Sequence, residues 1–163
     1  GALRGAEAQI IQNMLRLNEI HVEEIMTPRT VVFMVQKDST VKEVVDTPEF
    51  KQFTRIPLYD KSPDDLAGWV LKADLYEALR NGEGEKKVSA LKRTLHAVPE
   101  VAPLLRVLEE FARRSTHIFQ VVDEYGGTAG ILTLEDVVES VIGREIMDET
   151  DAVADLRRLA QPK

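Results

Sequence analysis

The hydrophobic positions of this 163-residue chain follow the same order of patterns twice. The first copy begins with an apolar run at 31–35, and the second begins with an apolar run at 95–98. Each run is followed by apolar residues spaced three or four positions apart, which is typical of one buried face of a helix. These helical positions are Val41, Val44 and Val45 in the first copy, and Leu104, Leu108, Phe111 and Ala112 in the second.

Two strand-like segments and a second helix complete each copy. The segments 55–60 and 117–123 both end in an aspartate at a turn, and further strands begin at Leu66 and Thr128. The glycines at 68 and 130, and the aspartates at 74 and 136, are each 62 positions apart. The pattern predicts an α+β fold in which a strand-helix-strand-strand-helix unit occurs twice. Because one unit cannot cover both of its faces, we expect a pseudo-twofold pair with a central cleft.

The segments outside the duplication predict two further regions. Residues 3–17 carry apolar residues at helical spacing, so an amphipathic helix precedes the repeat. The acidic stretch 148–151 opens a weakly periodic tail, for which a solvated linker is a more ordinary interpretation than a metal site. The predicted division is 1–21 for the N-terminal helix, 22–84 for the first unit, 85–145 for the second unit and 146–163 for the acidic C-terminal linker.

Composition narrows the range of functions. The formal net charge is −7, from 28 acidic and 21 basic residues, which disfavours nucleic acid as a partner. The chain has no cysteine, and none of its apolar runs approaches the ~20 residues that a membrane-spanning helix needs. No nucleophile triad, catalytic carboxylate pair or phosphate-binding loop is recognisable, and Gly126-Gly127 is better explained as a hairpin turn. We therefore expect neither an enzyme nor a protein-ligated metal site.

The most informative short motif is Thr133 followed three positions later by Asp136. This spacing before an apolar helical run predicts a capping box, in which each side chain binds the backbone of the other residue. A strand that turns into a helix here also presents backbone N–H groups and the positive end of the helix dipole, which favour a phosphate or another anion. The local pattern leaves open whether the pair only caps the helix or also binds a ligand.

Four longer motifs, in their order and spacing, resemble one protein family. The doubled unit with its Gly-aliphatic-aliphatic-Thr-x-x-Asp turn resembles a tandem pair of CBS domains (cystathionine-beta-synthase domains), also called a Bateman module. The more specific motifs are VEEIMTPR at 22–29, TRIP at 54–57, DEYGGTAGILTLEDVV at 123–138 and EIMDETD at 145–151. They resemble the CorC/CorB and CNNM group of magnesium and cobalt transport proteins, which are also described as haemolysin-like.

The resemblance covers about residues 7–151 and implies a regulatory function. In that family the CBS pair lies on the cytoplasmic side of a membrane transport domain of the same chain and binds an adenine nucleotide, ATP or AMP, with Mg²⁺ carried on the phosphates. Two pairs associate as a homodimer. Residues 1–21 would then be the connector helix from the last membrane span, and the module would control a magnesium or cobalt transport protein.

The resemblance also implies a nucleotide site in the second unit. By similarity, Asp136 would accept hydrogen bonds from the ribose hydroxyls, and Thr133 would face the phosphates. An ionised carboxylate is a strong acceptor for a diol. The adenine would lie between the starts of two strands of the second unit. The matching residues are Thr94, Leu95 and Ala97 on one strand and His117 and Ile118 on the other.

Two further positions leave alternatives open. Arg55 is the basic residue best placed across the cleft to meet a phosphate tail, although a salt bridge is an equally ordinary role for it. In the first copy Leu71 replaces the threonine, so the family pattern predicts a degenerate, weak or empty second site around Thr30 and Asp74. Intact Thr133 and Asp136 favour a nucleotide sensor. The change at Leu71 favours the alternative, a ligand-free structural dimerisation module.

Overall fold

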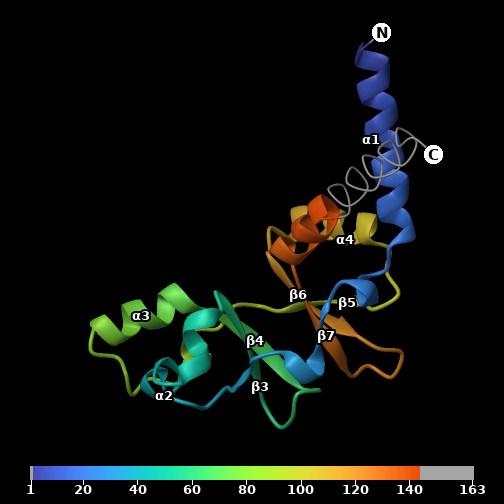
Figure 1. The fold of residues 1–163 in the computed structure, drawn as a ribbon. Helices are drawn as coiled ribbons and strands as arrows, with labels where there is room; N and C mark the ends of the chain where they lie inside the picture. The colour runs from blue at the N-terminus through green and yellow to red at the C-terminus, as the bar shows by residue number, and fades with distance from the viewer. Residues whose placement is uncertain (1, 144–163) are drawn as a thin grey trace, which may run out of the picture.

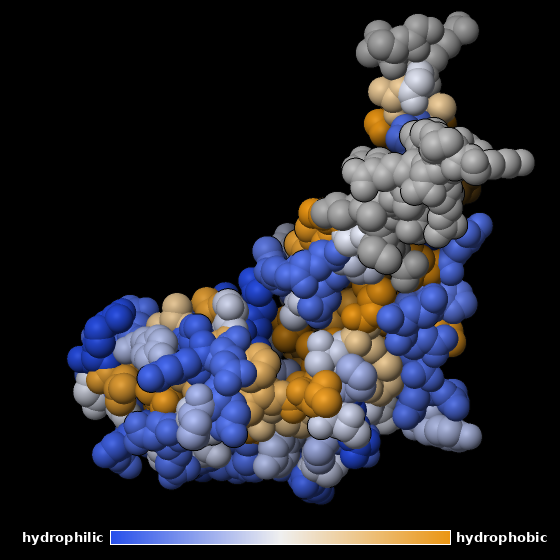
Figure 2. Space-filling view, in the orientation of Figure 1, coloured by the Kyte–Doolittle hydropathy of each residue, from blue (hydrophilic) through white to orange (hydrophobic). Residues whose placement is uncertain are grey.

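The computed structural model describes residues 2–143 and begins with a long helix that projects from the body of the molecule (Figure 1). This helix, α1 (Ala2–Glu19), confirms the helix predicted at 3–17. Within residues 2–143, no helix is long and apolar enough to cross a membrane. Exposed apolar side chains lie along α1, and Figure 2 shows hydrophobic surface on this projecting part; they are Ile10, Ile11, Met14 and Leu15. The predicted linker at 146–163 and the motif at 145–151 lie outside the described residues.

The first unit is built on a three-stranded sheet with the order β2-β3-β4. Strand β2 runs parallel to β3, and β3 runs antiparallel to β4. Its elements are β2 (Val35–Gln36), α2 (Val41–Val45), the 3-10 helix η3 (Pro48–Gln52), β3 (Arg55–Tyr59), β4 (Leu66–Leu71) and α3 (Lys72–Arg80). Helices α2 and α3 contact each other, and buried residues of both belong to the same core as those of β3 and β4. The predicted order of elements is confirmed for this unit.

The second unit repeats this arrangement on a four-stranded sheet with the order β1-β7-β6-β5. Strand β5 is parallel to β6, and β6 is antiparallel to β7. Its elements are β5 (His96–Pro99), α4 (Leu104–Arg114), β6 (Ile118–Val122) and β7 (Thr128–Thr133), and residues 134–143 are helical. The α+β class, the doubled unit and the N-terminal helix are therefore confirmed. A small apolar cluster formed by Trp69, Ile118 and Ile131 joins the two units.

The segment that leads into each unit packs on the other unit. Strand β1 (Thr27–Pro28) precedes the first unit in the chain but pairs antiparallel with β7 of the second. The 3-10 helix η1 (Val22–Glu24) before it places Val22 in the second core. Conversely, η4 (Val88–Leu91) places Val88 in the first core, and Arg93 forms a bridge with Trp69 of β4. The two units are therefore interlocked through exchanged leading segments.

This exchange changes one predicted strand. The apolar run at 31–35 forms a strand only at its last residue, which begins β2. Before it lies the 3-10 helix η2 (Arg29–Val31), which contacts β7. After leaving β1 in the second sheet, the chain must cross to the first sheet, so the residues between them cannot stay in either hydrogen-bond ladder.

Two glycines allow the exchanged segments to approach the sheets closely. A Cβ atom added to Gly68 would lie 2.7 Å from the carbonyl oxygen of Arg93. A Cβ atom added to Gly130 would collide with the carbonyl oxygen of Thr27. Both obstacles are backbone atoms and cannot rotate away. The absence of a side chain at these two positions therefore permits the interlock.

We predict that Gly130→Ala destabilises the protein by about 2 kcal/mol or more, because the added methyl group overpacks a backbone contact. Gly5→Ala is the control, since a Cβ atom at this helical position meets nothing within 4 Å. That control should be neutral or slightly stabilising. Urea unfolding followed by circular dichroism measures both changes, and a Gly130→Ala protein as stable as the parent would contradict the role of this glycine.

Candidate functional site

A cavity of about 490 Å³ lies between the two units and is lined by both of them. This volume lies within the range of small-molecule sites. The lining residues from the first unit and its leading segment are Thr27, Val31, Val32, Phe33, Gln52, Phe53, Thr54, Arg55 and Pro57. Those from the second unit are Ile118, Ile131, Thr133, Glu135, Asp136 and Glu139. A bound molecule would therefore contact both halves of the fold.

Thr133 and Asp136 form the predicted capping box at the edge of this cavity. The Thr133 backbone N–H donates to Asp136 Oδ2 at 3.3 Å, and the Asp136 N–H donates to Thr133 Oγ1 at 3.2 Å. Within residues 2–143, Asp136 has no ion-pair partner. The capping interpretation is confirmed. Because both residues also line the cavity, the cap holds a carboxylate and a hydroxyl group where a ligand could reach them.

Arg55 connects the two units across the cavity. It begins β3, its side chain is only 16% exposed, and its Nη1 atom lies 3.0 Å from Oε1 of Glu135. Burial alone would raise the pKa of Glu135, but its backbone hydrogen bond and the Arg55 charge lower the pKa below the ordinary value. The salt-bridge role considered for Arg55 is confirmed, and its contact with a phosphate stays a prediction.

Two aromatic rings that the motifs did not identify also line the cavity. Phe33 and Phe53 stack with their ring centroids 5.3 Å apart and their planes inclined by 16°. Stacked or offset rings are favourable neighbours for another flat ring. Phe33 lies in the apolar run at 31–35, and Phe53 directly precedes the TRIP motif. Phe33 and Phe53 are apolar residues in the sequence, but no sequence pattern indicated that their side chains line a cleft.

The structure brings together only some of the residues that the resemblance singled out. Arg55, Ile118, Thr133 and Asp136 all line the cavity. His117 does not, since it lines a smaller cavity beside α4, and its Nδ1 atom lies 3.7 Å from Oε1 of Glu135.

The three residues expected on the other side of the adenine lie elsewhere. The carbonyl oxygen of Thr94 accepts a hydrogen bond from Trp69 Nε1 at 3.1 Å, and Leu95 packs against the Trp69 cluster. Ala97 pairs with Gln120 inside the sheet of the second unit. The exchange explains this placement, because Thr27 and residues 31–33 line the cavity beside Asp136, whereas residues 93–95 lie against β4 of the first unit.

The region around Asp74 is arranged differently. Arg93 Nη2 lies 2.8 Å from Asp74 Oδ2, and the Arg93 guanidinium lies over the Trp69 ring, 5.5 Å from its centroid. Leu71 precedes α3 without a side-chain cap. Thr30 is exposed within η2, which contacts β7, so it lies on the side of the second unit. The protein's own arginine thus engages the carboxylate that corresponds to Asp136.

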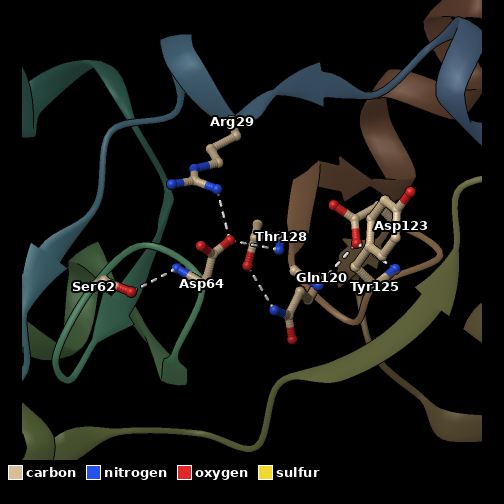
Figure 3. A network of polar contacts seen from close by, with 8 residues as sticks. Arg29, Ser62, Asp64, Gln120, Asp123, Tyr125 and Thr128 are labelled. Atoms are coloured by element: carbon tan, nitrogen blue, oxygen red, sulfur yellow. Dashed lines mark hydrogen bonds and ion pairs between the residues drawn. The ribbon is translucent and has the colours of Figure 1, made fainter.

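A polar network holds the hairpin turns of the two units together (Figure 3). Asp64, from the turn between β3 and β4, accepts a hydrogen bond from Arg29 Nη1 at 2.6 Å and another from the backbone N–H of Thr128 at 3.0 Å. Gln120 Nε2 donates to Thr128 Oγ1 at 2.8 Å. Strand β7 is therefore fixed at its first residue by the first unit, while Thr133 at its other end borders the cavity.

Comparison with known proteins places these features in a family. Residues 88–143 match the CBS domain family model. The chain is 40% identical over its full length to a UPF0053 protein of Synechocystis sp., of which it covers 47%. It is 39% identical over 92% of its length to Hemolysin C of Brachyspira hyodysenteriae, of which it covers 54%. The chain thus spans about half the length of these curated relatives.

Solved structures show the same fold. The CBS domain of a bacterial CNNM/CorC family Mg²⁺ transporter in complex with ATP is 33% identical, with a TM-score of 0.76, and the match covers 85% of this chain and 98% of that one. A CBS-domain pair with bound AMP from Klebsiella pneumoniae is 29% identical, with a TM-score of 0.62 and coverage of 76% and 98%.

We predict a pH-dependent contribution of Glu135 to stability. Since its folded-state pKa is lowered, the contribution is present above the ordinary glutamate pKa and is lost as the pH falls through the lowered value. Glu135→Gln should cost roughly 0.5 kcal/mol near neutral pH, because the pair is partly exposed, and the difference should vanish in acid. Glu139→Gln, which removes a carboxylate without an ion-pair partner in residues 2–143, is the control. Urea titrations at several pH values provide the measurement, and a deficit that is constant with pH would contradict this assignment.

Proposed function

The chain belongs to the CBS-domain modules of the CNNM/CorC family, and on that premise we propose that it senses an adenine nucleotide and regulates a membrane transport protein. The ligand would be ATP or AMP, with Mg²⁺ carried on the phosphates where present. The proposed role is regulatory, not enzymatic. The observation that supports it best is the cavity between the units, which combines two stacked aromatic rings with the Thr133/Asp136 turn and Arg55.

Each part of a nucleotide has suitable chemistry in this cavity. The flat base fits an apolar region lined by Phe33 and Phe53. The Asp136 carboxylate suits the ribose hydroxyls, since hydrogen bonds to a charged acceptor contribute about 1.5–3 kcal/mol. The Thr133 hydroxyl, the start of the following helix and Arg55 suit a phosphate group. The two related structures with ATP and AMP support the same ligand class.

A ligand in this position would act on the contact between the units. Because both units line the cavity, a bound nucleotide can favour one arrangement of them over another. Regulation requires that the affinity differ between the two arrangements, and the coupling is reciprocal. We propose that this change is passed along α1 to a membrane domain of the same full-length chain, on the cytoplasmic side, and to a second copy in a homodimer.

The alternative function is a structural dimerisation module that binds no nucleotide. The engagement of Asp74 by Arg93 favours it, because one of the two related carboxylates is already satisfied within the chain. The accessible Asp136 carboxylate and the open cavity favour the sensor. We therefore place one nucleotide site per chain at Asp136 and none at Asp74.

We predict that ATP, ADP or AMP raises the melting temperature, and that Asp136→Asn removes the increase. Ligand at a hundredfold excess over its Kd adds about 2.7 kcal/mol, and each kcal/mol corresponds to about 2–4 °C for a domain of this size. The asparagine oxygen can still accept the capping hydrogen bond, so the variant should fold. Differential scanning fluorimetry with and without Mg²⁺ makes the measurement.

The matched control is Asp74→Asn, the same substitution at the related position of the first unit, which should retain the full ligand-induced shift. A shift that persists in Asp136→Asn would overturn the assigned site. The absence of a shift with every nucleotide would support the structural module instead.

A further inference from the structure

We propose that Glu135 competes with the anionic part of the ligand for Arg55, so that binding exchanges one carboxylate-arginine pair for a phosphate-arginine pair. This inference rests on the proposed function and concerns the regulation of the same site. The salt bridge and the phosphate contact considered for Arg55 would then be two states of one residue. Glu135 would set how strongly the cleft distinguishes charged nucleotides from an uncharged nucleoside.

The arrangement of charges around the cavity supports this exchange. Arg55 is the only basic side chain in the described lining, and it shares that lining with three carboxylates. Its guanidinium is already used by one of them, Glu135, at 3.0 Å. A phosphate that enters the cavity therefore finds the one available cation occupied. Binding must either break this pair or share the arginine between two anions.

The two partners differ in their freedom to move. The Arg55 side chain is 16% exposed, whereas that of Glu135 is 53% exposed. The arginine is therefore held in place, while the glutamate can turn into solvent and recover its hydration. His117 lies 3.7 Å from the same glutamate oxygen and offers a second neighbour outside the cavity. Glutamate is ionised at neutral pH, and the nearby Arg55 charge favours this form of Glu135, so two anions compete for Arg55.

The exchange would also change the connection between the units. Arg55 begins β3 of the first unit, and Glu135 lies in the first turn of the helix over 134–143 of the second. Their ion pair is a direct bond across the cleft. When a phosphate replaces the carboxylate, the bond from Arg55 to the protein is replaced by a bond to the ligand. Ligand charge is thereby coupled to the packing of the two units.

Glu139 provides a matched comparison within the same cavity. It lies one helical turn after Glu135, lines the same space and has no ion-pair partner in residues 2–143. Removing either carboxylate makes the cavity less negative by one charge. Only the removal of Glu135 also frees Arg55. The two substitutions therefore separate a general charge effect from competition for the arginine.

The test is a double-mutant cycle measured by isothermal titration calorimetry with adenosine, AMP, ADP and ATP at one ionic strength and one Mg²⁺ concentration. Glu135→Gln should tighten binding of the three nucleotides by roughly two- to threefold, the size expected for a partly exposed ion pair, and leave adenosine unchanged. Glu139→Gln should give a smaller gain, since screening weakens charges that are not in contact. In an Arg55→Gln background, the gain from Glu135→Gln should fall to the size of the Glu139→Gln gain, because only the general charge effect remains, whereas the Glu139→Gln gain should be unchanged.

The outcomes separate this inference from the proposed function. If nucleotides bind the parent protein but Glu135→Gln and Glu139→Gln give equal gains, or if the excess gain of Glu135→Gln over Glu139→Gln survives without Arg55, the competition is refuted and the sensor stands. If the parent protein binds none of the nucleotides, the proposed function fails and this inference fails with it. Melting curves of each variant without ligand establish that all of them are folded.

Discussion

The close approach of two backbones at a glycine is the contact on which this fold depends. Thr27 lies against Gly130, and Arg93 lies against Gly68, so each sheet contacts the segment that leads into the other unit, as strand β1 in one case and as an isolated bridge in the other. The second sheet takes its edge strand β1 from the segment that leads into the first unit, and the first sheet is contacted through an isolated bridge to Arg93, so the two units are packed together through both leading segments. This exchange also shapes the cavity beside Asp136, because it is lined by Thr27 in the second sheet and by residues 31–33, where the chain crosses to the first sheet.

The pseudo-symmetry fixes two related positions but not their chemistry. Arg29 and Arg93 begin the two copies of the repeat, yet Arg29 pairs with Asp64 at the hairpin turns, whereas Arg93 pairs with Asp74. Arg93 therefore forms an ion pair with Asp74, the carboxylate of the first unit. Leu71 stands where the second unit has Thr133, so no hydroxyl group caps helix α3. Around Asp136 the threonine cap is intact and the nearby arginine is paired with a neighbouring glutamate instead. Within residues 2–143, the same framework thus holds one carboxylate paired with an arginine and a related one without an ion-pair partner.

The order of elements was predictable from the sequence because periodicity records which residues are buried within a unit. The sequence did not predict which unit each leading segment packs against. The contacts concerned are the two-residue strand β1 and the isolated bridge at Arg93, and such short pairings leave no periodic pattern of apolar residues. That gap explains why Thr94, Leu95 and Ala97 were expected near Asp136 but lie elsewhere, and why Phe33 and Phe53 were not identified. The capping pair Thr133 and Asp136 was predicted from its local spacing, whereas the roles of Ile118, Thr133 and Asp136 at a ligand site were implied by the family resemblance, and Arg55 was chosen as the basic residue across the cleft; all four line the cavity.

The cavity also constrains what kind of anion it can bind. Three carboxylates and one arginine line it, so its surroundings disfavour a simple inorganic anion. Backbone N–H groups at the start of the helix and the Arg55 guanidinium attract an anion locally. The negative charge of the three carboxylates opposes that attraction. Burial of a flat apolar group against Phe33 and Phe53 would add the free energy that the charges do not supply. A ligand that joins a ring system, a diol and a phosphate therefore suits this cleft better than any one of these groups alone.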